Sequence, residues 1–265
     1  MLELKNIVQR YDQKTVFEGV NMCLREGTVT CLVGHNGCGK STLLKLIGGL
    51  IPKDGGEIVC EKNYRISYVP DSLPVANMRA GSYLNHMAKM AGITSANERN
   101  RIISSYAEDF FLNDMLDNKM KNLSKGSLQK IGVIQAIIVN PDILLLDEPL
   151  TGQDCDSQQV FIQKMLELKR QQKIILFASH EQNLVKAIGD ETYTIDGARL
   201  IPYNRANHRM YSIILAYDGR CIPSDEMLVE NGNYIIKTSD GLLSITIDRL
   251  MQEGWHIKGV YEVEQ

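Results

Sequence analysis

The hydrophobic positions along the chain predict alternating strands and helices. Residues 2–8 alternate apolar and polar side chains, as a half-buried strand does. Residues 29–33 form a short, β-rich apolar run that ends at a glycine. The continuous apolar runs at residues 143–146 and 174–177 predict parallel strands that are buried on both faces. The helical pattern of residues 158–171 separates the last two runs. Together these three segments predict a β-α-β unit.

Further elements follow the first apolar run. Residues 41–50 predict a helix, and residues 58–60 and 66–69 predict short strands. From about residue 75 to residue 140 the pattern is helical. The apolar face of the first helix would consist of Leu43, Leu44, Ile47 and Leu50.

The pattern of predicted strands and helices changes near Pro202. Strand-like stretches at residues 211–217, 234–238 and 255–263 surround an amphipathic helix at residues 243–253. They predict a small α+β appendix after the alternating strands and helices.

The fold class predicted for the chain is therefore α/β. We expect a core with a mainly parallel sheet and antiparallel strands at the N-terminus, all within one domain over residues 1–202. The α+β appendix would form a second domain over residues 203–265.

Composition excludes several classes of protein. The chain has 265 residues, with 29 Lys+Arg against 32 Asp+Glu and a net charge of -3. Nucleic-acid binding is not expected, because it usually requires a basic excess or a basic stripe. No apolar run approaches the roughly 18 residues that a transmembrane helix needs. The charged, strand-like N-terminus is unlike a signal peptide. The six cysteines form no CxxC pair, and we expect reduced thiols packed as small apolar residues.

A glycine-rich loop carries the strongest chemical signal. Residues 34–42 read GHNGCGKST, which matches G-x-x-x-x-G-K-[ST] between a predicted strand and a predicted helix. Gly34, Gly37 and Gly39 would let the backbone curl around a phosphate with its N–H groups pointing inward.

Two side chains of the loop would contact the nucleotide directly. Lys40 would reach the β- and γ-phosphates, and the Ser41 hydroxyl would ligate Mg²⁺. The helix that starts here also directs its positive end at the phosphates. The loop alone does not choose among ATPases, GTPases and kinases. Its remaining candidate binding residues are His35, Asn36, Cys38 and Thr42.

Acidic residues and a histidine complete the candidate site. Residues 143–148 read ILLLDE, so Asp147 and Glu148 would reach the carboxyl edge of the sheet, where such folds bind ligands. Asp147 would hold Mg²⁺, and Glu148 would orient or deprotonate the attacking water. His180 ends another apolar strand and would contact the γ-phosphate region at the same edge.

With these motifs in place, the chain resembles the nucleotide-binding subunit of ABC transporters over roughly residues 1–200. The segment Leu123–Ser127, LSKGS, is similar to the family's LSGGQ signature and lies shortly before Asp147. The resemblance implies a head-to-tail dimer, either a homodimer or a heterodimer, in which Ser124 and Gly126 bind the ATP of the opposite subunit. Lys40 would bind the ATP of its own subunit.

Other positions gain a role from the same resemblance. Tyr11 would stack on adenine, and Asp154 would be the acid of the D-loop that crosses the dimer interface. Asp71 occupies the position of the family's Q-loop glutamine, where it would contact ATP and Mg²⁺. Lys125 replaces the first signature glycine, and it would face either the γ-phosphate or solvent. Ser127 replaces the final glutamine of the signature.

The resemblance implies a P-loop NTPase core and an ATPase that is the motor of a transporter. A transmembrane permease would dock on a helical subdomain at about residues 74–135, so the chain would be cytoplasmic and peripheral to the membrane. The sequence around residues 68–84 is similar to exporter subunits of the ABC-2 and antimicrobial-peptide types. Two other interpretations remain open, an ABC ATPase that drives a soluble complex and a regulatory subunit that does not hydrolyse ATP.

Overall fold

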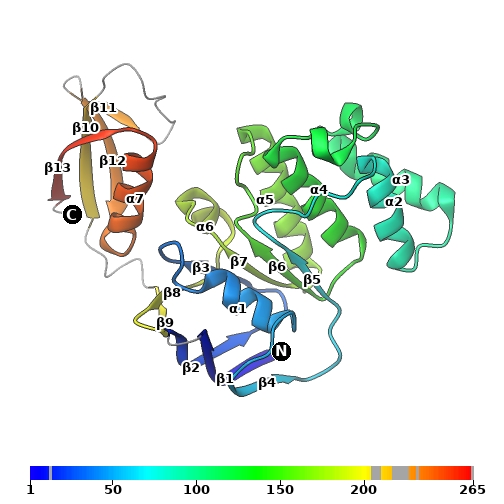
Figure 1. Ribbon diagram of the computed structural model, residues 1–265, viewed down its shortest axis with the longest axis horizontal. Helices are drawn as coiled ribbons and strands as arrows, with labels where there is room; N and C mark the ends of the chain where they lie inside the picture. Colours follow the sequence, from blue (N-terminus) through cyan, green and yellow to red (C-terminus); the bar gives the residue numbers. More distant parts are fainter. Residues whose placement is uncertain (12–13, 204–209, 217–226, 231–232, 264–265) are drawn as a thin grey trace. The chain divides into compact units, whose positions relative to one another are not determined.

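The structure is a computed structural model, and it describes residues 1–11, 14–203, 210–216, 227–230 and 233–263 (Figure 1). The chain divides into two compact units. The larger comprises Met1–Val33 and Gly39–Ile201, and the smaller comprises Gly34–Cys38 and Pro202–Gln265.

A six-stranded sheet forms the centre of the larger unit, with the order β5-β6-β7-β3-β8-β9. The strands are β3 (Val29–Val33), β5 (Ile66–Val69), β6 (Ile143–Asp147), β7 (Ile174–Ala178), β8 (Glu191–Asp196) and β9 (Arg199–Pro202). The first five strands in this order pair in parallel. Every residue of β3, β6 and β7 is buried, which explains why nearly all of their side chains are apolar. The predicted α/β fold with a mainly parallel sheet is confirmed.

The helices that follow strands of this sheet include α1 (Lys40–Ile47), α5 (Cys155–Arg170) and α6 (Gln182–Ile188). Helix α1 packs on β6 and β7, and α5 packs on β7 and α6. The prediction that the first helix reaches Leu50 is wrong. The helix ends at Ile47 because two glycines follow, the second with φ of 66°, and Leu50 is 57% exposed.

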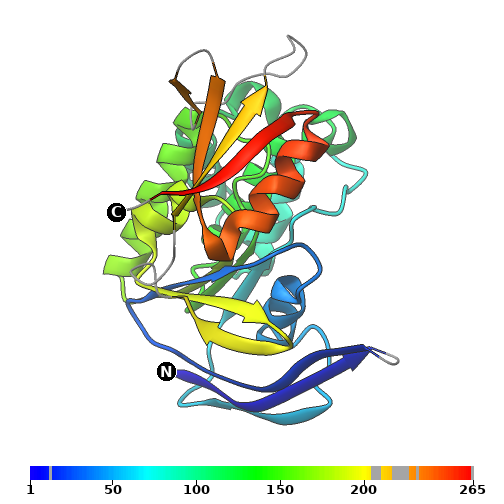
Figure 2. The same cartoon turned by 90° about the vertical axis from the view of Figure 1, so that its left-hand side faces the viewer.

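The N-terminal strands form a separate antiparallel sheet with the order β2-β1-β4. Its strands are β1 (Leu2–Tyr11), β2 (Lys14–Leu24) and β4 (Gly55–Cys60), and Figure 2 shows them side by side in blue and cyan. The sequence pattern missed β2. Its alternation is interrupted at Gly19, where the pairing of β1 with β2 shifts register.

The region predicted to be helical contains α2 (Ala80–Met90), α3 (Ala96–Asp109) and α4 (Lys125–Ile138). Two short 3-10 turns, η1 (Asn113–Met115) and η2 (Met120–Asn122), lead into α4. Helix α4 packs on α2 and α3 and also on β5 of the main sheet. It therefore joins the helical region to the sheet.

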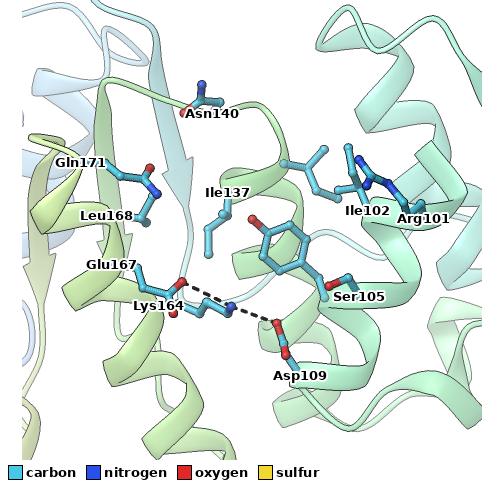
Figure 3. A pocket seen from close by; sticks show the side chains of 12 residues that line it. Arg101, Ile102, Ser105, Asp109, Ile137, Asn140, Lys164, Glu167, Leu168 and Gln171 are labelled. Atoms are coloured by element: carbon cyan, nitrogen blue, oxygen red, sulfur yellow. Dashed lines mark hydrogen bonds and ion pairs between the residues drawn. The ribbon is translucent and has the colours of Figure 1, made fainter. Parts of the chain in front are cut away.

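A cavity of about 420 Å³ lies between α3, α4 and α5 (Figure 3). Lys164 of α5 forms ion pairs at 3.0 Å with Asp109 of α3 and at 3.4 Å with Glu167 of its own helix. Its Nζ also lies 5.7 Å from the ring centroid of Tyr106. Burial raises the pKa of the Tyr106 hydroxyl. Lys164 thus links α5 to the helical region.

The smaller unit contains an antiparallel sheet with the order β11-β12-β10-β13. Its strands are β10 (Met210–Ala216), β11 (Leu228–Glu230), β12 (Asn233–Ser239) and β13 (His256–Val263), and α7 (Asp240–Gln252) packs on three of them. The core of this unit consists of Ile213, Leu215, Ile236, Leu250 and Trp255. Tyr217, the last residue of one predicted strand, lies outside the described residues.

Two expectations from composition can be compared with the structure. Within the described ranges, no helix is long and apolar enough to cross a membrane. The prediction that most cysteines are packed inside is wrong for the five that the structure describes. Cys31 is buried, whereas Cys60 and Cys155 are exposed. The sixth, Cys221, lies outside the described residues.

Candidate functional site

The glycine-rich loop connects β3 to α1. Gly34, Gly37 and Gly39 have φ of 147°, 78° and 116°, which are left-handed conformations that L side chains rarely adopt. At Gly39 an added Cβ would lie 2.8 Å from Val16 Cγ1 and 2.9 Å from the Phe17 ring. Only glycine therefore fits at the end of the loop.

Lys40 is the first residue of α1, and it is 6% exposed. A nearly buried cation at a helix N-terminus is a site of positive potential, because the helix dipole adds to the charge of the ammonium. The first turn of α1 contains no acidic residue. The beginning of α1 is therefore suited to an anion such as a phosphate.

Asp147, the last residue of β6, is 3% exposed. The hydroxyl of Tyr68 donates a hydrogen bond of 3.2 Å to Asp147 Oδ2, and the side chain of Ser41 is also hydrogen-bonded to this carboxyl. Burial raises the pKa of Asp147, and the negative charges of Glu148 and Asp71 raise it further. Burial and the nearby Asp147 charge raise the pKa of the Tyr68 hydroxyl as well.

This arrangement fits a magnesium ion. A desolvated carboxylate beside a hydroxyl offers only oxygen ligands, which Mg²⁺ prefers. Among the described residues, no group of three or more His, Cys, Asp or Glu side chains could hold a metal. Mg²⁺ at nucleotide sites commonly uses one or two protein ligands and takes the others from phosphates and water. Ser41 and Asp147 would be those ligands here.

Glu148 lies in a strained turn immediately after β6. Its φ is 47°, which is unusual for a residue that is not glycine. Its backbone N–H donates to Ala178 O at 2.9 Å, and its carbonyl accepts from the Thr151 hydroxyl at 3.1 Å. Strain of this kind persists only where surrounding contacts fix it, and it is concentrated at functional sites.

The Glu148 side chain is paired with His180, which follows β7. His180 Nδ1 lies 2.9 Å from Glu148 Oε2, and the Glu148 side chain is 15% exposed. A hydrogen bond to this carboxylate requires the proton on Nδ1. The structure therefore brings together two residues that the sequence placed at the same sheet edge.

The signature segment, Leu123–Ser127, forms the start of α4. Ser124 is the N-cap of the helix, and its Oγ accepts a 3.1 Å hydrogen bond from the backbone N–H of Ser127. At Gly126 an added Cβ would lie 2.1 Å from the carbonyl oxygen of Gly152. The helix start thus packs directly against the turn that follows Glu148.

Gln129 is a site residue that the sequence interpretation missed. It is 1% exposed, and its Nε2 donates to Pro70 O at 3.1 Å and to Asp147 O at 3.4 Å. It thereby joins α4 to the ends of β5 and β6. Its sequence signal was weak, because a single Gln on a buried helix does not reveal which carbonyls it meets. Tyr68 was also missed, because the sequence does not show which side chain its hydroxyl contacts.

Two further ion pairs connect α4 to neighbouring loops. Lys125 Nζ lies 3.1 Å from Asp71 Oδ1, so a side chain predicted to face phosphate or solvent is paired with an acid of the same chain. Lys130 lies 3.2 Å from Asp154, the N-cap of α5. The N–H and hydroxyl of Ser157, followed by Lys130, hold the pKa of Asp154 well below its usual range.

Two other predicted site residues have more limited contacts. Tyr11 ends β1 opposite Lys14 and is 49% exposed, so its ring is open for stacking. His35 Nδ1 lies 2.9 Å from the carbonyl oxygen of Asn36, next to it in the loop.

Known proteins of one family are similar to this chain. The family model described as ABC transporter matches residues 17–151. The zinc import ATP-binding protein ZnuC of Pasteurella multocida is 30% identical over 197 residues, which cover 74% of this chain and 73% of that protein. The ABC transporter ATP-binding protein NatA of Bacillus subtilis is 31% identical over 227 residues, covering 80% of this chain and 92% of that protein.

Solved structures show the same fold. An ATP-binding subunit of an ABC transporter superposes with a TM-score of 0.71 at 25% identity, covering 78% of this chain and 91% of that one. The dimeric post-hydrolysis structure of an ATP-binding cassette bound to ADP and Pi gives a TM-score of 0.70 at 21% identity. It covers 76% of this chain and 96% of the other.

Proposed function

Since this chain belongs to the ABC transporter family of ATP-binding proteins, we propose that it hydrolyses Mg-ATP as the motor subunit of a transporter. The observation that carries this proposal is the pairing of Glu148 with His180 beside the buried Asp147. A subunit that only bound ATP would not need a strained glutamate held against a histidine. The same contact therefore argues against the regulatory interpretation.

Each residue of the site has a distinct part in the proposed mechanism. Lys40 and the N–H groups of the glycine-rich loop hold the phosphates. Glu148 orients the attacking water and accepts its proton, while His180 fixes the Glu148 carboxylate through Nδ1. Mg²⁺, held by Ser41 and Asp147, would neutralise charge that develops on the phosphate oxygens.

The second part of the proposal is a head-to-tail dimer. Ser124 and Gly126 lie at the N-terminal end of α4, where backbone N–H groups and the helix dipole favour an anion. In the proposed dimer this helix end contacts the γ-phosphate of the ATP in the opposite subunit, while Tyr11 stacks on the adenine of its own. The solved relative that holds ADP and Pi is dimeric, which supports this assembly.

We further propose that the subunit works at the inner face of a membrane through a permease. The permease would dock on the helical subdomain, at about residues 74–135 of the domain spanning 1–202. The similarity of residues 68–84 to exporter subunits favours export, although several relatives are named for zinc import. The appendix, residues 203–265, would be a separate domain.

The hydrolysis step is tested with Glu148→Gln. Losing a group that acts in the transition state commonly lowers the rate about 100- to 1000-fold, whereas ATP binding should persist. Glu108→Gln, an exposed substitution of the same chemistry on α3, is the matched control. If Glu148→Gln hydrolyses ATP as fast as the parent protein, the assignment of the base is wrong.

The transport role is tested by purifying the tagged protein from gently solubilised membranes. A multi-spanning membrane protein recovered in about equal amount would support the transporter, and it would be the chain that determines the cargo. Recovery of a soluble complex with no membrane protein would favour the alternative ABC ATPase.

A further inference from the structure

Two unusual residues of the site meet each other in the structure. Asp71, in the segment after β5, lies 3.1 Å from Lys125 at the start of α4. Their side chains are 48% and 52% exposed. Among the described residues, neither side chain forms an ion pair with any other group. The acid in the Q-loop position and the lysine in the signature segment therefore form one matched pair.

The surroundings explain why each member needs the other. Lys125 lies in the first turn of α4, where the helix dipole disfavours a cation and no acidic residue is present. Asp71 lies close enough to Asp147 for its charge to raise the pKa of that carboxyl, and Glu148 does the same. Asp71 is thus the outermost of three carboxylates, and Lys125 neutralises it.

We propose that Lys125 is a positioning residue for Asp71 and competes with the nucleotide-bound divalent cation for its carboxylate. The proposal rests on the proposed function, because it needs a cation site at Ser41 and Asp147. While the ion pair persists, Asp71 is held at the start of α4 and its charge is offset. When the pair opens, the negative potential at the cation site increases.

The exposure of the pair sets the size of the effect. Half-exposed ion pairs are weak because water screens them, so this pair can open at little cost. Removing Lys125 should tighten cation binding about 2- to 5-fold. A deeply buried pair would be a fixed structural contact instead, and its removal would disturb folding.

Cation binding can be measured without turnover in full-length Glu148→Gln protein. Mn²⁺ is titrated in the presence of ATP, and free Mn²⁺ is followed by electron paramagnetic resonance. Lys125→Gln should tighten Mn²⁺ binding 2- to 5-fold, and Asp71→Asn should weaken it. In the Asp71→Asn background, Lys125→Gln should have no further effect. Lys121→Gln, which removes an exposed charge just before α4, is the control and should leave Mn²⁺ binding unchanged.

Three results would overturn the proposal. Lys125→Gln could leave Mn²⁺ affinity unchanged while weakening ATP-driven dimerisation, which would assign Lys125 to the partner's phosphate. Lys125→Gln could tighten Mn²⁺ binding equally with and without Asp71, which would indicate general electrostatics. Absence of ATP binding by Glu148→Gln itself would reject the proposed function, and this inference with it. In the first two cases ATP binding persists, so failure of this inference can be distinguished from failure of the proposed function.

Discussion

The contact between Gly126 and Gly152 allows a quantitative test of how α4 is attached to the site. Gly126→Ala adds one methyl group to the first turn of α4. That methyl would lie 2.1 Å from Gly152 O and 2.9 Å from Gly152 C. Both are backbone atoms, so no side-chain rotation can relieve the overlap. The helix start and the turn after Glu148 must move apart.

Two opposing effects determine the magnitude. Alanine is favoured over glycine within a helix by about 1 kcal/mol. Non-bonded heavy atoms prefer about 3.5 Å, so the overlap demands a shift of roughly 1 Å. Overpacking of this kind costs about 1–3 kcal/mol and occasionally more. The difference between these two effects is a net loss of up to about 2 kcal/mol, or a fall in Tm of up to roughly 8 °C for a domain of this size.

Gly132→Ala in the same helix is the matched control. Its new methyl would lie 3.3 Å from Val69 Cγ1 and 3.7 Å from Leu73 Cδ1. These are side-chain atoms that can give way by a few tenths of an ångström, so the helix-propensity gain is retained. Thermal unfolding of both variants and of the parent protein gives the comparison, and steady-state ATP hydrolysis is measured alongside. Gly126→Ala should also lose hydrolysis, because the displaced turn begins at Glu148. A Gly126→Ala protein that melts at or above Gly132→Ala would refute the reasoning.

Two other predictions concern the D-loop acid and the smaller unit. Contacts from Ser157 and Lys130 hold the pKa of Asp154 low, so its contribution to stability is present above its unfolded pKa of about 4. That contribution is lost as the pH falls through the folded pKa. Asp154→Asn should therefore have a lower Tm than the parent protein at pH 7, and this difference in Tm should disappear at acidic pH. A difference in Tm that does not depend on pH would contradict this. Trp255 is 3% exposed, so Trp255→Ala should cost about 3–5 kcal/mol in urea unfolding followed by circular dichroism. The exposed Tyr261→Ala should change stability by under about 0.5 kcal/mol, and equal losses would show that Trp255 is not a core residue.

The sequence alone determined the central sheet and the location of its chemistry. Strands β3, β6 and β7 are buried on both faces, so nearly all of their side chains are apolar. Because parallel strands share one carboxyl edge, the residues that follow them had to lie together. The contact between Glu148 and His180 is the direct result.

The local pattern of apolar and polar residues did not predict the irregular elements correctly. Strand β2 contains a register shift at Gly19, which breaks the alternation that identifies a half-buried strand. The end of α1 depended on the backbone conformation at Gly49, and the pattern of apolar residues alone extended the helix to Leu50.

Only the tertiary structure decided which side chains meet around the site. Tyr68 reaches Asp147 because β5 and β6 pair in one particular parallel register. Gln129 and Lys125 find their partners because α4 packs against β5, far from these residues in sequence. Spacing along a chain fixes which residues end a strand or begin a helix. Contacts between elements depend instead on the packing of the whole unit, which local sequence patterns do not predict.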